Sequence, residues 1–125
     1  VTTDADGVQH TRDGTVEYRV VSDDPRVAGT VIGTWNTDRW GEMTGGVMVQ
    51  WGDATLTNEG GTWQATYQGA FASPIGDIIT RWWRGSGGYE GLTFFMWIGG
   101  SELGAPFFDW SGVIVPGDPP PGAPE

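Results

Sequence analysis

Residues 62–71 read TWQATYQGAF, and in this stretch apolar and polar side chains alternate. One set of alternate positions holds Trp63, Ala65, Tyr67, Gly69 and Phe71, and the other holds Gln64, Thr66 and Gln68. A period of two residues is typical of a β-strand with one buried and one solvated face. We therefore predict a strand here whose Trp, Tyr and Phe side chains point toward the core.

Seven further segments have strand-like patterns, and Gly, Pro, Asn or Asp residues separate most of them. They are residues 15–21, 26–36, 45–51, 53–58, 77–84, 91–99 and 106–115. No stretch combines good helix formers with apolar residues at helical spacing. Eight short strands with turn signals about every ten residues predict an all-β domain.

Short connections make neighbouring strands pair as antiparallel hairpins. A meander of eight such strands closes most simply as an up-and-down β-barrel, which is the fold class we predict. A two-sheet sandwich is the alternative, although it normally needs longer crossovers than these loops allow. The predicted organisation is a flexible N-terminal arm (1–13), a barrel domain (14–115) and a Pro-rich tail (116–125) that holds five of the eight prolines.

Composition excludes several classes of function. The chain has 125 residues, enough for one domain, and a net charge of −10 with six Arg and no Lys. A nucleic-acid binder needs a basic surface, and an anionic membrane would repel this chain, so we predict neither partner. The absence of Cys excludes disulfides and thiolate metal sites, and no motif indicates a metal or another cofactor.

Three segments carry large apolar side chains on both faces. In 77–84, Trp82 and Trp83 point in opposite directions, and in 91–99 Phe95 and Trp97 oppose Phe94. The segment 106–115 has the same two-sided pattern. One barrel interior cannot hold both faces, so something must cover the outside. A second copy of the chain, in a homodimer or homotrimer, is the simplest cover. The N-terminal arm or the C-terminal tail is the alternative.

Aromatic side chains are the candidate ligand-binding residues. The set that could line one cavity is Trp35, Trp51, Trp63, Tyr67, Trp82, Phe94 and Met96. Ligand pockets are mostly apolar with a few polar groups, but the same residues could simply fill a packed barrel. Exposed Trp40, Trp83 and Trp97 could alternatively stack on sugar rings.

Three charged residues within strands are the candidate catalytic groups: Glu17, Arg81 and Asp109. Arg81 and Asp109 each lie among aromatic residues, and a buried charge needs a partner. An Arg81–Asp109 pair would form a polar island that could polarise a carbonyl or move a proton. Glu17 shares a face with Arg19, and a solvated pair is the simpler interpretation there.

Four segments together resemble the allene oxide cyclase-like barrel superfamily, which includes dirigent proteins. They are SDDPRVAGT (22–30), GGTW (60–63), GSGGYEGL (85–92) and GVI (112–114). The chain also resembles secreted actinobacterial proteins. The resemblance implies an eight-stranded barrel, often oligomeric and secreted, with an apolar cavity. It assigns no catalytic residue, because no motif around the family's catalytic groups matches this chain.

The function we predict is the binding of a small apolar or aromatic molecule inside the barrel. Its enzymatic form would be a cyclase or isomerase that holds a flexible substrate in a reactive conformation. The alternatives are a structural or assembly module without catalysis, and a carbohydrate-binding module that uses exposed Trp.

Overall fold

The computed structural model describes residues 1–41, 46–72, 76–101 and 110–120, and every regular element in them is a β-strand. The strands are β1 (Thr2–Thr3), β2 (Gln9–Val20), β3 (Gly29–Trp40), β4 (Val47–Asn58), β5 (Gly61–Ala72), β6 (Gly76–Gly87), β7 (Leu92–Ser101) and β8 (Trp110–Pro116). A helix long and apolar enough to cross a membrane does not occur in these residues.

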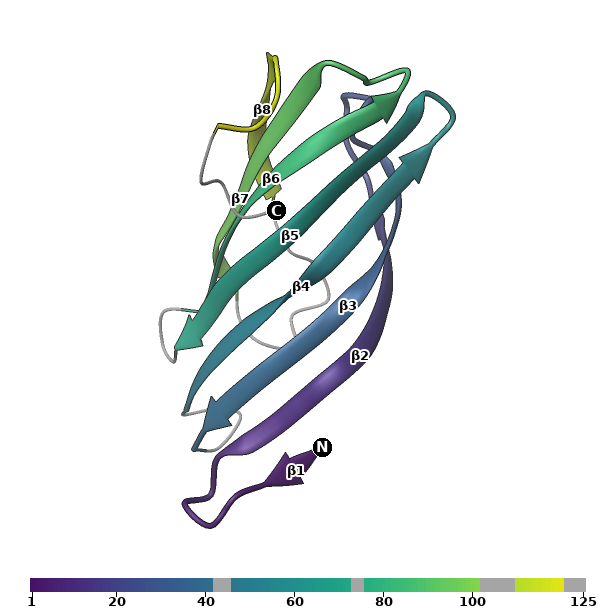
Figure 1. Ribbon diagram of the computed structural model, residues 1–125. Coiled ribbons are helices and arrows are strands. Elements are labelled where there is room, and N and C mark those ends of the chain that lie inside the picture. The colour runs from purple at the N-terminus through teal and green to yellow at the C-terminus, as the bar shows by residue number, and fades with distance from the viewer. Residues whose placement is uncertain (42–45, 73–75, 102–109, 121–125) are drawn as a thin grey trace.

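The eight strands form one antiparallel sheet in chain order, from β1 to β8 (Figure 1). This confirms the coarser part of the prediction: an all-β chain of eight antiparallel strands. The turn between β4 and β5 shows how the sequence favours a hairpin. The side chain of Asn58 accepts a hydrogen bond from the Gly60 amide at 3.0 Å, and Gly61 adopts a φ of +154° that other residues rarely take.

The largest difference from the predicted strand bounds lies in β4. The segments 45–51 and 53–58 are one strand, β4, because Gly52 continues the ladder instead of breaking it. A Cβ atom at Gly52 would lie 2.1 Å from the backbone oxygen of Thr34, so glycine here permits close strand approach. The strand count is still eight, because the short β1 pairs with residues 9–10 of β2.

The strand β2 begins at Gln9, so residues 9–13, which the prediction placed in the arm, belong to the sheet. Between Thr11 and Gly14 the pairing of β2 with β3 shifts by one residue. Asp13 takes a φ of +54° at this bulge, and the Asn36 side chain accepts a hydrogen bond from its amide at 2.9 Å. The bulge keeps alternate side chains on the correct face on both sides of the shift.

The prediction of a closed barrel is wrong, because the sheet is open. Among the described residues, no backbone pairing joins β8 to β1 or β2. β8 has seven residues and pairs only with β7, while β1 occupies one end of the free edge of β2. The two edges meet through side chains instead, because the rings of Tyr18 and Trp110 lie 5.9 Å apart in an edge-to-face contact.

The core lies on one face of the sheet, called here the inner face. No helix or second sheet covers it in the described residues, so the sheet must curl to bury this face against itself. The fully buried side chains of the inner face are Val31, Leu56, Trp63, Trp83 and Met96. On the opposite face, Thr93 is also fully buried. The prediction for 62–71 is confirmed, because Trp63, Tyr67 and Phe71 are buried while Gln64 and Gln68 are exposed.

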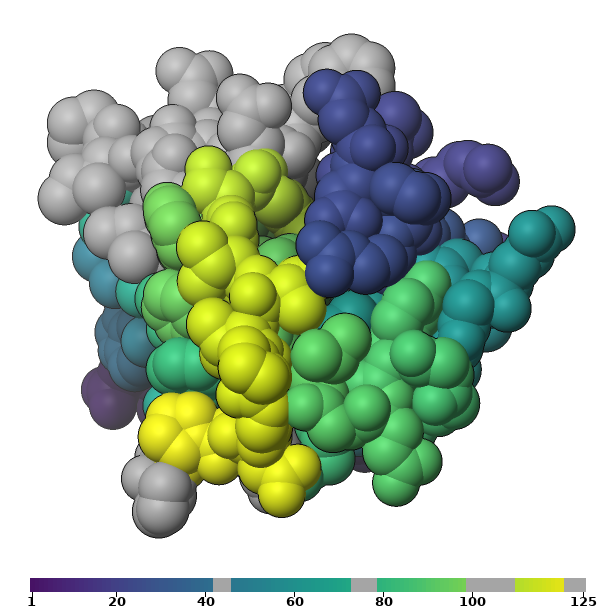
Figure 2. Space-filling view, turned by 90° about the horizontal axis from the view of Figure 1, so that it is seen from above, coloured from purple at the N-terminus to yellow at the C-terminus, as the bar shows by residue number. Residues whose placement is uncertain are grey.

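One end of the curled sheet is closed by the connections that follow β2, β4 and β6. The Asn58 amide donates to the backbone oxygens of Pro25, Arg26 and Ala28, and its oxygen accepts from the Tyr89 hydroxyl at 2.6 Å. Tyr89 stacks on Trp63 with ring centroids 4.8 Å apart. Figure 2 views this end, where the dark blue, green and yellow parts of the chain pack together.

The start of the predicted Pro-rich tail is tied to the sheet. Pro116 is the last residue of β8, a position that tolerates proline because β8 is an edge strand. The Gly117 amide donates to Gly91, and its carbonyl accepts from the Thr93 hydroxyl, both at 2.7 Å. Asp118 forms an ion pair with Arg84 at 3.1 Å. Residues 121–125 of the tail lie outside the described residues.

Candidate functional site

The candidate site is centred on Arg81, a charged residue in the middle of the inner face. Arg81 lies on β6, directly opposite Tyr67 of β5 and Met96 of β7. Alternation along β6 places its side chain on the same face as Ile79 and Trp83, so it is buried with them. Only 5% of Arg81 is exposed to solvent. A buried guanidinium is uncommon, because removing a charge from water is costly.

Aromatic rings surround the Arg81 guanidinium. Its Cζ atom lies 4.3 Å from the centroid of the Tyr67 ring, 5.3 Å from that of Trp83 and 5.6 Å from that of Trp110. These cation–π contacts compensate part of the lost hydration. The Nη1 atom also donates a hydrogen bond of 3.1 Å to the Tyr18 hydroxyl. Residues from β2, β5, β6 and β8 therefore meet at one cation.

Two polar atoms in this cluster have no hydrogen-bond partner among the described residues. They are Nε of Arg81 and Nε1 of Trp83, and both are buried. Buried donors are normally satisfied, so two unpartnered donors on one strand face call for an explanation. The expected partner, Asp109, lies outside the described residues. Among the residues the structure describes, no carboxylate forms an ion pair with Arg81.

Tyr67 stays protonated in this environment. Burial raises the pKa of its hydroxyl to about 12, although the nearby positive charge of Arg81 opposes the rise. The hydroxyl donates a 3.2 Å hydrogen bond to the backbone oxygen of Thr34. Tyr67 is therefore a neutral donor and a ring surface at physiological pH, and a poor proton acceptor.

The predicted ligand-binding residues divide between the two faces. Trp35, Trp63, Tyr67, Phe94 and Met96 lie on the inner face and belong to the core or pack against it. Trp51 and Trp82 lie on the opposite, outer face, where Trp51 is covered by Arg12 and Trp82 contacts Phe95. The seven residues therefore do not line one cavity.

The indole nitrogens of two inner tryptophans donate hydrogen bonds to other residues of the chain. Trp63 is fully buried, and its Nε1 atom donates to the Arg26 backbone oxygen at 2.8 Å. Trp35 donates to the Gln50 side chain at 3.1 Å. These contacts assign Trp63 to the closed end of the sheet and distinguish it from Trp83, whose nitrogen is unpartnered.

Sequence reasoning missed three residues of the Arg81 cluster: Tyr18, Trp83 and Trp110. Trp83 was one of three tryptophans in the alternative prediction of sugar stacking, and its complete burial is inconsistent with that role. The sequence could have indicated this burial, because Trp83 shares one strand face with Ile79 and Arg81 when side chains alternate. Tyr18 and Trp110 have no such signal, because their meeting depends on how far the sheet curls.

Glu17, the third candidate catalytic residue, is not part of this cluster. Its side chain is exposed on the outer face of β2, and it pairs across the sheet with Ile32. Arg19 is exposed on the same face, as expected from the alternation with Val16, Tyr18 and Val20. The structure therefore brings neither Glu17 nor Arg19 near the buried guanidinium of Arg81.

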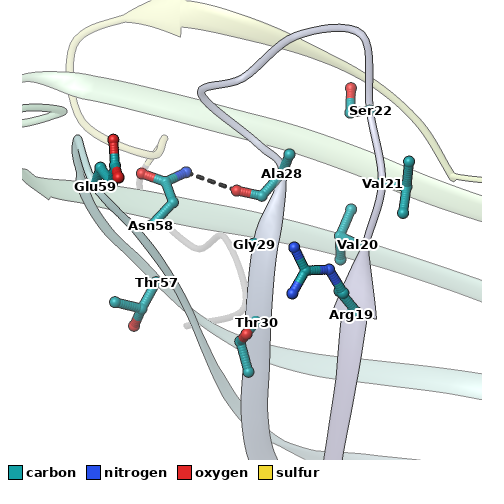
Figure 3. Close-up of a pocket in the computed structure, with 10 residues that line it drawn as sticks. All are labelled: Arg19, Val20, Val21, Ser22, Ala28, Gly29, Thr30, Thr57, Asn58 and Glu59. Carbon is teal, nitrogen blue, oxygen red and sulfur yellow. Dashed lines mark hydrogen bonds between the residues drawn. The ribbon is translucent and has the colours of Figure 1, made fainter.

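Arg81 lines neither of two surface grooves, although Tyr67 borders the second. One, of about 370 Å³, lies beside the β2–β3 connection, where Asn58 is already bonded to Ala28 (Figure 3). The other, of about 780 Å³, lies along β3, β4 and β5 and includes Trp51, Asp53 and Gln68. The Asp53 carboxylate in it accepts a hydrogen bond from Thr34 at 3.1 Å. The described residues hold no group of three or more His, Asp or Glu that could bind a metal ion.

The fold and the Arg81 cluster define an all-β protein built from one open, antiparallel meander, with a buried cation on its inner face. Comparison of the chain with protein-family models, with curated proteins and with solved structures finds no match.

Proposed function

We propose that the protein binds a small, largely apolar molecule on the inner face of the sheet, beside Arg81. The observation that carries this proposal is the pair of buried, unpartnered donors, Arg81 Nε and Trp83 Nε1. A bound molecule with an oxygen at one end would satisfy both donors, while its apolar part contacts the aromatic rings.

Two further features support a ligand at this place. Gly33, Ala54 and Ala65 form one row across β3, β4 and β5, and their small side chains fill little of the inner face. The unpaired edges of β2 and β8 provide a route to the inner face that needs no break in a backbone ladder. The side chains of Tyr18 and Trp110 contact each other across these edges.

The resemblance to allene oxide cyclase-like proteins favours a cyclase or isomerase as the enzymatic form of this function. In such a reaction the aromatic side chains would hold a flexible substrate in its reactive conformation, which lowers the entropic cost of ring closure. Arg81 would polarise a substrate carbonyl by donating to its oxygen. Tyr67 would act as a surface and a fixed donor, since its raised pKa keeps the hydroxyl protonated.

Native mass spectrometry of the freshly purified protein tests ligand binding. We expect an additional mass that is released when the same sample is denatured, and we expect the neutral fluorescent probe N-phenylnaphthylamine to compete with it. Arg84→Met should retain the additional mass, because Arg84 lies on the same strand as Arg81 but is exposed. A bare chain in the native spectrum, together with no binding of the probe, would overturn the proposal.

Self-association is a second candidate function, favoured by an apolar patch on the outer face. The patch consists of Trp82, Phe95, Trp97 and Val113 on β6, β7 and β8. Trp82 and Phe95 lie 4.5 Å apart between ring centroids, and Phe95 and Trp97 lie 5.7 Å apart. Trp97 is 42% exposed and Val113 is 52% exposed. Pairing of two β8 edges around a twofold axis would join two such patches.

A further inference from the structure

We infer that the ligand of the inner face is an organic anion: a small aromatic body that carries a carboxylate or another oxyanion, which Arg81 binds. This inference rests on the proposed function and names the chemical class of its ligand. It draws on the charge, the geometry and the surroundings of Arg81, and each of these points to an anion more than to a neutral molecule.

The first argument is charge. Arginine side chains carry their positive charge in proteins, whereas a buried lysine can become neutral. Only 5% of the residue is exposed, and no carboxylate of the described residues pairs with it. Ring faces and one neutral hydroxyl compensate it only in part. A ligand that brings a negative charge completes the compensation, whereas a neutral ligand leaves it incomplete.

The second argument is the geometry of the free edge. Nη1 is used by the Tyr18 hydroxyl, and Nε has no partner. The edge of a guanidinium that contains Nε presents two parallel N–H groups, which match the two oxygens of a carboxylate. The unpartnered Nε1 of Trp83 supplies a further donor on the same strand face. Donors that lack an acceptor are complemented by a ligand group with several lone pairs and no proton to donate.

The third argument concerns the surroundings of Arg81. The chain carries a net charge of −10, so its overall field opposes the approach of anions. An anion that binds must therefore be held by a local, desolvated contact. The neighbouring rings of Tyr67, Trp83 and Trp110 favour a flat aromatic body beside the oxyanion.

A matched pair of fluorescent probes tests the inference on the intact chain. Anilinonaphthalene sulfonate (ANS) and N-phenylnaphthylamine share one aromatic skeleton, and only ANS carries an oxyanion. We expect Arg81→Met to weaken ANS binding by about tenfold or more, and to change binding of the neutral probe by less than about twofold. Arg84→Met should leave both affinities unchanged, because it removes the same charge from the exposed face of the same strand.

Arg81→Lys provides a second variant if Arg81→Met folds poorly. It keeps the positive charge but loses the planar edge, so ANS binding should weaken while binding of the neutral probe stays the same. Equal effects of Arg81→Met on both probes, or no effect on either, would overturn the anion inference and leave apolar binding intact. Failure of every variant and of the wild type to bind either probe would overturn the proposed function itself.

Discussion

The Arg81 guanidinium on β6 donates a 3.1 Å hydrogen bond to the Tyr18 hydroxyl on β2. These residues are 63 positions apart in the chain, and three strands separate β2 from β6 in the sheet. The bond therefore spans the interior of the curled sheet instead of following its ladder. It is one of the contacts that hold the open edge of β2 over the inner face.

Removing this bond should be costly only while the charge is present. We expect Tyr18→Phe to lower the free energy of unfolding by about 1–2 kcal/mol, because the buried cation loses a partner. In an Arg81→Met background the same change should be nearly neutral, since no buried charge remains. Urea denaturation of the four proteins in this double-mutant cycle measures the coupling. A coupling close to zero would show that Arg81 and Tyr18 do not interact in solution.

Gly52 tests the close approach of β3 and β4. We expect Gly52→Ala to lower the free energy of unfolding by about 2–3 kcal/mol, because a Cβ would lie 2.1 Å from the Thr34 backbone oxygen. Gln64→Thr, an exposed change on the neighbouring strand, should stay within about 0.5 kcal/mol. Thermal unfolding followed by circular dichroism measures both. Wild-type stability in Gly52→Ala would show that the strands lie farther apart at this point.

Asn58 tests the closed end of the sheet. Asn58→Asp keeps the shape of the side chain but places a carboxylate against the oxygens of Pro25, Arg26 and Ala28. We expect a loss of about 2–3 kcal/mol at neutral pH, and a loss of about 1 kcal/mol for Tyr89→Phe. Chemical denaturation gives both values. If Tyr89→Phe proved the more damaging change, the Asn58 amide would not be the main link between these loops.

His10 lies between two carboxylates and should titrate above its ordinary range. Protonated, it donates to Asp38 at 2.6 Å and to Asp4 at 3.2 Å, while Arg12 also pairs with Asp38. The hydrogen bond to Asp38 is the main reason that the pKa of His10 is raised from 6.5. His10 is the only histidine, so its ring protons report this pKa directly in an NMR titration. Asp38→Asn should bring the value back toward 6.5.

The sign of the resulting pH dependence follows from these shifts. The contribution of His10 is complete below pH 6.5 and is lost as the pH rises through its higher folded pKa. The pKa values of Asp4 and Asp38 are lowered, the first mainly by the Val8 amide and the second mainly by His10. Their contributions are therefore lost only as the pH falls below 3.8. A His10 pKa at or below 6.5 would contradict this arrangement.

Trp97 tests the outer apolar patch. If two copies associate through it, Trp97→Ser should shift the protein from dimer to monomer in analytical ultracentrifugation. Trp40→Ser is the matched control, since Trp40 is 46% exposed but lies on β3, away from the patch. Equal behaviour of the two variants would exclude the patch as the interface.

Much of the local structure follows from the sequence, because alternation along a strand is a local property. The faces of Trp63, Tyr67 and Phe71 were predictable, as was the two-sided character of the strand that contains Trp82 and Trp83. The predicted break at Gly52 was wrong, since a turn and a close strand approach both favour glycine. Sequence alone did not distinguish them, because the difference lies in the position of Thr34 on another strand.

The candidate site was predictable only in part. Arg81 was identified as a candidate because it interrupts an apolar segment, and its burial makes that interruption significant. Its aromatic partners Tyr18 and Trp110 were not predictable, since they come from opposite edges of the sheet. The closed barrel was predicted incorrectly for the same reason, because closure also depends on how the two edges of the sheet meet.

By itself, the sequence determined that this chain forms antiparallel strands, which of them are apolar on both faces, and that a charge lies among their aromatic residues. These properties depend on the alternation and composition of neighbouring residues. Only the tertiary structure decided that the sheet stays open and that Tyr18, Tyr67, Trp83 and Trp110 meet at Arg81. Those outcomes depend on the twist and register summed over eight strands, to which every pairing contributes and which no single segment encodes.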